Sequence, residues 1–99
     1  MKVKSKDYRE FLLQELSQDP GLAAGYLTAS FEDGDKDAFL GALRDVVDAL
    51  GGVTKISKKT KLNRSNIYKM LNGNPTIASL ASILNTAGLG ISFYNKKAS

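Results

Sequence analysis

Hydrophobic residues recur along most of the chain at the three- and four-residue spacing of amphipathic helices. The first set predicts a short helix that ends near Ser17, with inward positions Tyr8, Phe11, Leu12 and Leu16. Asp19 and Pro20 then predict the start of a second helix. An Asp side chain can accept hydrogen bonds from the free amides of the first turn, and Pro fits the first helical position because the backbone N–H that it lacks would have no partner there. The inward positions of this second helix are Leu22, Ala23, Tyr26, Leu27 and Phe31.

A third helix is expected after the break at Gly34, with Asp35 as its cap and the Gly51–Gly52 pair as its end. Its inward residues follow helical spacing and are Phe39, Ala42, Leu43, Val46, Val47 and Leu50. Residues 53–60 hold only two apolar residues, Val53 and Ile56, so a helix there is predicted from its neighbours more than from periodicity.

Asn63 can cap the next helix, which turns Ile67, Met70 and Leu71 inward and ends at Asn72 and Gly73. A last helix follows Pro75 and ends at Gly88. Its predicted buried residues are Ile77, Leu80, Ala81, Ile83, Leu84 and Ala87.

Residues 89–94 change to a period of two, since Leu89, Ile91 and Phe93 alternate with less apolar residues. The pattern predicts a half-buried strand that lacks a partner within the chain. The expected fold class is therefore all-α: a compact five- to six-helix domain with a short C-terminal β-strand. We divide it into an N-terminal helical extension (1–34), a central domain (35–88), and a C-terminal strand and tail (89–99).

Residues 51–73 have the spacing of a helix-turn-helix: a short helix, a three-residue turn, a second helix and a glycine stop. The two helices of this motif cross steeply, so the first needs a small residue where they touch. Ser57 fills that position, and the matching apolar positions are Ile56, Leu62, Ile67 and Leu71. The pattern predicts a helix-turn-helix DNA-binding domain in 35–88.

The second helix of such a motif presents its N-terminal side chains to base edges in the major groove. The candidate base contacts are Arg64, Ser65, Asn66 and Lys69. Arg64 suits a bidentate contact to guanine, and Asn66 could pair with adenine. The alternative is that Arg64 and Lys69 are only solvated surface residues, and Tyr68 could equally pack or touch DNA.

Candidate phosphate contacts surround this helix, on the first motif helix, the turn and the helix ends. They are Thr54, Lys55, Lys58, Lys59, Lys61, Asn63 and Asn72. Phosphate contacts fix the position of a protein on DNA without reading its sequence. One helix cannot turn every face to DNA, so only two or three of the residues from Thr54 to Lys61 are expected to matter, and Asn72 could simply end its helix.

Charge is divided unevenly along the chain, whose net charge is +4. All ten acids lie before Ala49, while the rest of the chain carries eight bases and no acid. A basic half suits a polyanion such as DNA. The chain has no cysteine and no histidine, which removes disulfides, thiol nucleophiles and the usual zinc ligands. We therefore expect no enzyme, metal or cofactor. No stretch approaches the roughly 20 apolar residues of a membrane helix, so we also expect no membrane segment and a cytoplasmic location.

Three segments carry a family resemblance: YLTASFEDGDKDAFLGALRDVVDALGG, ISKKTKLNRSNIYKMLNG and NPTIASLASILNTAGLGISF. Over residues 25–94 the chain resembles the antidote proteins of addiction modules (HigA-like antitoxins), which have a Cro/phage-repressor-like helix-turn-helix. Lys61 and Ser57 depart from this pattern, since the family usually has glycine and alanine there. The resemblance favours Arg64, Ser65 and Lys69 as DNA contacts. It implies a transcriptional repressor that neutralises a small, basic RelE/HigB-like toxin and regulates its own operon.

The acidic half offers a candidate surface for that toxin: Glu32, Asp33, Asp35 and Asp37 around Gly34. The simpler interpretation is a solvated loop with a helix cap. Tyr8, Phe11 and Tyr26 would be apolar anchors if they were exposed, and core residues otherwise. Two copies are expected to bind a DNA operator as a homodimer through residues 89–94. The alternative functions are a protein-binding module and a stand-alone regulator without a toxin.

Overall fold

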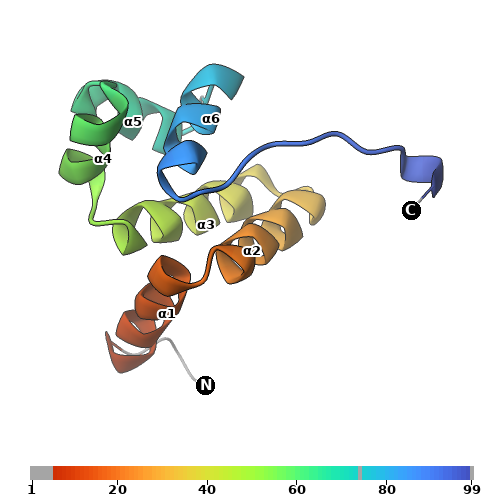
Figure 1. Cartoon of the computed structure of the whole chain (residues 1–99), viewed down its shortest axis with the longest axis horizontal. Helices are drawn as coiled ribbons and strands as arrows, with labels where there is room; N and C mark the ends of the chain where they lie inside the picture. The colour runs from red at the N-terminus through yellow and green to blue at the C-terminus, as the bar shows by residue number, and fades with distance from the viewer. Residues whose placement is uncertain (1–5, 74, 99) are drawn as a thin grey trace.

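The computed structural model describes residues 6–73 and 75–98 and contains six α-helices and a short 3-10 turn. In chain order these are α1 (Lys6–Gln18), α2 (Pro20–Glu32), α3 (Lys36–Ala49), α4 (Val53–Thr60), α5 (Arg64–Leu71), α6 (Ile77–Thr86) and the turn η1 (Lys96–Ala98). Helix α3 runs through the middle of the molecule, with α1 and α2 on one side and α4 to α6 on the other (Figure 1). The all-helical prediction is confirmed.

The helices begin where short polar side chains accept hydrogen bonds from otherwise open backbone amides. Asp19 accepts from the amide of Leu22 at 3.1 Å, and Pro20 follows as the first residue of α2. Asp35 accepts from the amides of Asp37 and Ala38 at 2.9 and 3.3 Å. Both predicted helix starts are therefore confirmed.

One hydrophobic core joins both sides of α3. Leu43, Val46 and Val47 of α3 are at most 1% exposed and form its centre. Leu16, Ala23 and Leu27 of the two N-terminal helices join the same cluster as Ile56, Ile67 and Ile83. Because burying a branched aliphatic side chain contributes about 1.5 to 3 kcal/mol, this shared core holds the helices in fixed relative positions.

A cluster of hydrogen-bonded polar side chains links α1, α2 and α3 beside this core. Asp45, only 9% exposed, accepts a hydrogen bond from the Tyr26 hydroxyl at 2.5 Å and one from the Arg9 guanidinium at 2.8 Å. Arg9 also pairs with Asp48 at 2.6 Å. Burial, followed by the bond to Asp45, raises the pKa of Tyr26 to about 12. Each oxygen of this buried carboxylate therefore has a hydrogen-bond donor within the chain.

Several residues predicted to be buried are exposed instead. Phe31 is 67% exposed and Ile77 is 70% exposed, while Leu22 and Ala81 also face solvent. Helix α2 is apolar on most of its circumference but packs mainly on α1 and α3, so Leu22 remains exposed and Phe31, which contacts the Phe39 ring, is only partly covered. Ile77 opens α6 at the edge of the core. Tyr8 and Phe11 are also exposed, whereas Tyr26 is partly buried.

The predicted C-terminal strand is wrong, because the described part of the chain contains no strand. Leu89 packs against the core, and its amide donates to the carbonyl of Leu84 at 2.9 Å. Beyond it, no backbone hydrogen bond joins residues 90–94 to another described residue. A strand needs a neighbouring strand to complete its hydrogen bonds, and no other described segment offers one. The Tyr94 hydroxyl instead donates to Glu32 at 3.0 Å.

Candidate DNA-binding surface

The two short helices predicted on either side of a three-residue turn are present as α4 and α5, joined by residues 61–63. Gly51 and Gly52 precede α4 with φ of +109° and +92°, a backbone conformation that other residues rarely adopt. A Cβ at Gly51 would lie 2.5 Å from Cδ of Lys55, so the Lys55 side chain lies across this glycine. Ile56 of α4 and Ile67 of α5 are fully buried and fix the angle at which the two helices cross.

Side chains of α4 close the turn. Ser57 donates to the carbonyl of Leu62 at 2.6 Å, and Thr60 donates to the carbonyl of Ile56 at 2.8 Å. The Thr60 hydroxyl in turn accepts from the amide of Leu62 at 3.1 Å. The serine that stands where alanine is usual therefore stabilises the turn through a hydrogen bond that alanine could not make.

Lys61 begins the turn in the left-handed conformation, with φ of +66°. It is the only described residue other than glycine with a positive φ. The usual glycine would adopt this conformation without the steric cost that a Cβ imposes, which is about 1 kcal/mol. Lys61 therefore places a cation at the turn at the expense of local backbone strain.

Asn63 caps α5, because its side-chain oxygen accepts from the amide of Asn66 at 2.7 Å. Met70 and Leu71 are buried with Ile67 on the inner side of α5, as predicted. The opposite side of α5 faces solvent and carries the residues that could reach DNA.

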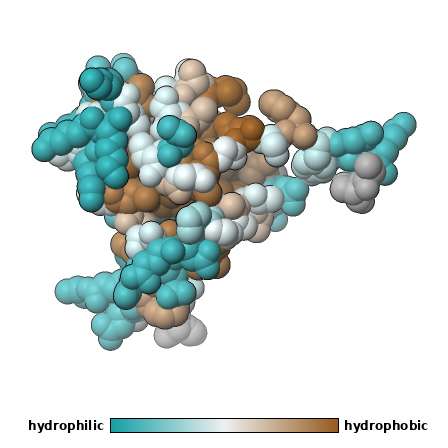
Figure 2. Space-filling model, viewed as in Figure 1, coloured by the Kyte–Doolittle hydropathy of each residue, from teal (hydrophilic) through white to brown (hydrophobic). Residues whose placement is uncertain are grey.

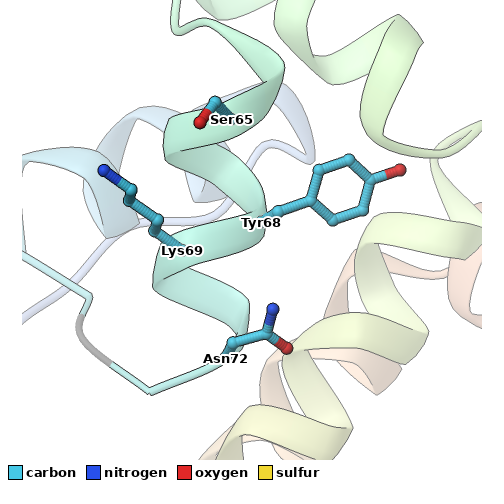
Figure 3. Close-up of a pocket in the computed structure, with 4 residues that line it drawn as sticks. All are labelled: Ser65, Tyr68, Lys69 and Asn72. Carbon is cyan, nitrogen blue, oxygen red and sulfur yellow. The ribbon is translucent and has the colours of Figure 1, made fainter.

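Four side chains on this outer side line an open, shallow depression: Ser65, Tyr68, Lys69 and Asn72. Ser65 and Lys69 project to the same side of α5, whereas Tyr68 projects away from them, toward α3 and α4 (Figure 3). Arg64 and Asn66 are exposed too, but helical geometry places them on opposite flanks of this row. The fold thus groups Ser65 with Lys69 and separates the other two candidate base contacts.

The candidate phosphate contacts on α4 and the turn are all exposed: Thr54, Lys55, Lys58, Lys59 and Lys61. Within the part of the chain that the structure describes, none of these lysines forms an ion pair, and neither does Arg64 or Lys69. Hydrophilic side chains gather over the end of the molecule where α4 and α5 lie (Figure 2). This end combines uncompensated positive charge with an exposed helix face.

Two cations from α3 hold the C-terminal end of α5, and the sequence did not indicate either of them. Arg44 donates to the carbonyl of Leu71 at 2.7 Å and lies 3.5 Å from the side-chain oxygen of Asn72. The Lys36 ammonium donates to the carbonyl of Gly73 at 3.0 Å. Carbonyls at a helix end lack partners within the helix and favour nearby cations. The sequence predicts where α5 ends and therefore that its last carbonyls need donors, but it does not indicate that Arg44 and Lys36 supply them.

The described residues contain no group of three or more Asp or Glu side chains that could hold a metal ion. No helix among them is long and apolar enough to cross a membrane. The family model for probable addiction module antidote proteins matches residues 7–95, so the chain belongs to this family. No curated protein and no solved structure matches the chain. Membership of an antidote family implies a toxin as partner.

Proposed function

We propose that the chain is the antitoxin of a type II toxin–antitoxin module: a cytoplasmic, sequence-specific DNA-binding repressor that regulates its own operon and neutralises a small RelE/HigB-like toxin. The observation that carries the DNA-binding half is the outer side of α5. Its exposed Ser65 and Lys69 lie beside an acid-free basic surface, while the inner side of the helix is locked into the core.

In the proposed complex, α5 enters the major groove. Ser65 and Lys69 reach the bases at the centre of the contact, with Arg64 and Asn66 at its two sides. The lysines of α4 and the turn lie against the phosphates, where each neutralised phosphate releases counterions and strengthens binding at low salt. Asn63 keeps only its amide nitrogen for phosphate, since its oxygen caps α5.

The chain binds its operator as a homodimer in this proposal, because one α5 helix makes few base contacts and two copies can occupy successive turns of the duplex. Apolar surface is visible near α6 and the chain that follows it (Figure 2). Ile91 and Phe93 are exposed in that segment, with Phe93 at 93%. Solvent exposure of this extent favours contact with a second copy.

The toxin is proposed to dock on the acidic half, where the exposed residues Glu32, Asp33, Asp35 and Asp37 could complement a basic protein. Asp35 contributes less to this surface, since its carboxylate already caps α3. The DNA-binding side of the molecule then remains open while the toxin is held.

DNA binding can be tested by fluorescence anisotropy with the duplex that lies upstream of the chain's own coding region, against a random duplex of equal length. We expect tighter binding to the first duplex and an affinity that falls at least tenfold between 50 and 200 mM salt, because several phosphates are contacted. The double variant Lys58→Ala, Lys59→Ala should reduce this salt dependence. Lys96→Ala, Lys97→Ala removes the same charge from η1 and serves as the control. Equal, salt-independent affinity for both duplexes would instead favour a protein-binding module.

A further inference from the structure

The outward side of α2 has no charged residue between Asp19 and Glu32. Helices on the surface of a soluble protein normally carry polar and charged residues on their outer side, and a helix that is apolar all round is normally buried. Helix α2 is not buried: it packs mainly on α3 and α1, and the Tyr94 hydroxyl reaches Glu32 at its C-terminal end (Figure 1). It therefore presents an uncovered apolar helix face to solvent.

This α2 outer face is defined by seven exposed, uncharged residues: Gly21, Leu22, Ala24, Gly25, Thr28, Ala29 and Phe31. Its centre is flat, because Gly25 and its small neighbours bring the backbone close to the surface. A Cβ added at Gly25 would meet no atom within 4 Å, so the space above it is open. Leu22 and Phe31 stand at the edges as the larger apolar side chains.

The Phe31 ring is fixed although 67% of the residue is exposed. It packs edge-on against Phe39, with ring centroids 5.5 Å apart and an interplanar angle of 77°. Phe39 itself packs against the hydrophobic core. A ring that is already held in place loses little conformational freedom when a partner binds, which favours Phe31 as an anchor.

Negative charge lies directly beyond the Phe31 end of this face. Within the described part of the chain, the carboxylates of Asp33 and Asp37 have no hydrogen-bond or ion-pair partner. The one base of this turn, Lys36, donates to the carbonyl of Gly73. The face is thus apolar and flat, with uncompensated acid at one end, which is complementary to an apolar surface rimmed by basic residues.

We infer that the α2 outer face is the docking surface for a basic partner protein, anchored by Phe31 and Leu22 and steered by Asp33 and Asp37. The inference rests on the proposed function, in which that partner is the toxin of the same module. Charge complementarity mainly accelerates association, whereas burial of the anchors sets the lifetime of the complex. Small residues in the centre allow a partner element to approach the α2 backbone closely.

Gly25→Gln on the full chain tests the inference, because it fills the docking face without touching the chain's own core. The control is Gly41→Gln in α3, where an added Cβ also meets no atom within 4 Å. Both changes replace a helical glycine, so both should raise the melting temperature. The probe is the purified toxin encoded in the same module, with binding measured by biolayer interferometry and operator binding measured in parallel.

We expect Gly25→Gln and Phe31→Ser each to weaken toxin binding by about 30-fold or more, the loss that marks an interface anchor. Gly41→Gln and Phe11→Ser should change it less than about threefold. Asp33→Asn with Asp37→Asn should slow association and leave dissociation nearly unchanged. Operator binding should persist in every variant.

The inference is overturned if Gly25→Gln binds the toxin as tightly as the original chain does, or if Phe11→Ser weakens binding more. It is also overturned if Gly25→Gln dissociates a homodimer and leaves toxin binding intact, because the face then belongs to a second copy. If the unaltered chain binds no toxin, the proposed antitoxin function fails with it, whereas loss of operator binding alone refutes only the repressor function.

Discussion

The guanidinium of Arg44 in α3 lies 2.7 Å from the carbonyl oxygen of Leu71, the last residue of α5. The helix proposed to read DNA is therefore held at its C-terminal end by a side chain from the central helix of the fold. Lys36 of the same helix donates to the carbonyl of Gly73, just beyond the end of α5. The angle of α5 thus depends on two charged side chains that themselves lie outside the proposed DNA contacts.

Replacing Arg44 by alanine should therefore affect both stability and DNA binding. Loss of a charge-assisted hydrogen bond to a helix carbonyl should lower the free energy of unfolding by about 1 to 2 kcal/mol. Urea unfolding followed by circular dichroism measures this loss. Lys59→Ala removes the same charge from an exposed position on α4 and should change the free energy by less than about 0.5 kcal/mol. Equal stability of the two variants would show that Arg44 does not brace α5.

Lys61→Gly should stabilise the chain, because glycine adopts the left-handed conformation of this position without steric cost. A gain of about 0.5 to 1 kcal/mol would raise the melting temperature by several degrees in a domain of this size. Lys58→Gly removes the same charge inside α4 and should lower stability by about 1 kcal/mol, since glycine weakens a helix interior. Thermal unfolding of the two variants gives opposite signs if this account of the turn is right.

Much of this architecture could be predicted from the sequence because the relevant signals are local. Capping by Asp19, Asp35 and Asn63 depends on residues two or three positions away, and the buried stripe of α3 repeats within one helix. The contacts of Arg44 with Leu71 and of Arg9 with Asp45 span 27 and 36 positions. Such pairs depend on how the helices pack, which periodicity does not specify.

The errors at Phe31 and in the C-terminal segment have the same origin. Apolar spacing indicates that a residue can be buried, but burial also needs a neighbouring element, and none covers the outward side of α2. Alternation in 89–94 likewise indicates that a strand is possible, yet a strand forms only where another supplies its hydrogen bonds. The candidate DNA contacts were predicted correctly as exposed, but only the structure separates Arg64 and Asn66 from the central row.

Stability should fall at alkaline pH through Tyr26, whose pKa is raised to about 12 in the folded chain by burial and by Asp45. An unfolded tyrosine has a pKa near 10. Between about pH 10 and 12 the unfolded chain therefore releases a proton that the folded chain retains, which favours unfolding. The stabilisation is fully present below pH 10 and is lost as the pH rises toward 12.

The variant Tyr26→Phe tests this contribution, because it removes the titrating hydroxyl and leaves every other ionisable residue in the chain. Its deficit in free energy of unfolding relative to the original chain should be largest between pH 7 and 9 and should shrink above pH 10. Chemical unfolding at several pH values measures the difference. A deficit that grows with pH would mean that Tyr26 is ionised in the folded chain.

Phe93→Ser tests the proposed homodimer. Phe93 is 93% exposed, so removal of its ring should leave the fold and the melting temperature of a monomer unchanged. Burial of the ring against a second copy would instead make it an interface residue, and its loss should shift the chain toward monomer in sedimentation equilibrium. Ile77→Ser changes another strongly exposed apolar residue, at the start of α6, and shows whether the interface extends there. A chain that is monomeric at micromolar concentration before any substitution contradicts the dimer.

Arg64 and Lys58 should differ in what they contribute to DNA binding, although both are exposed cations of the helix-turn-helix. Arg64 begins α5, where a side chain can reach base edges, so Arg64→Ala should cost about 1 to 3 kcal/mol on the operator and relax base choice. Lys58 lies on α4, which rests against the DNA phosphates in the proposed complex. Lys58→Ala should therefore weaken binding to operator and random DNA alike and lower the slope of log affinity against log salt concentration by about one.

Anisotropy titrations of both duplexes at four salt concentrations separate the two effects. If both variants lose the same affinity on both duplexes, Arg64 contacts phosphate, and the reading of bases falls to Ser65 and Lys69 in the centre of the row.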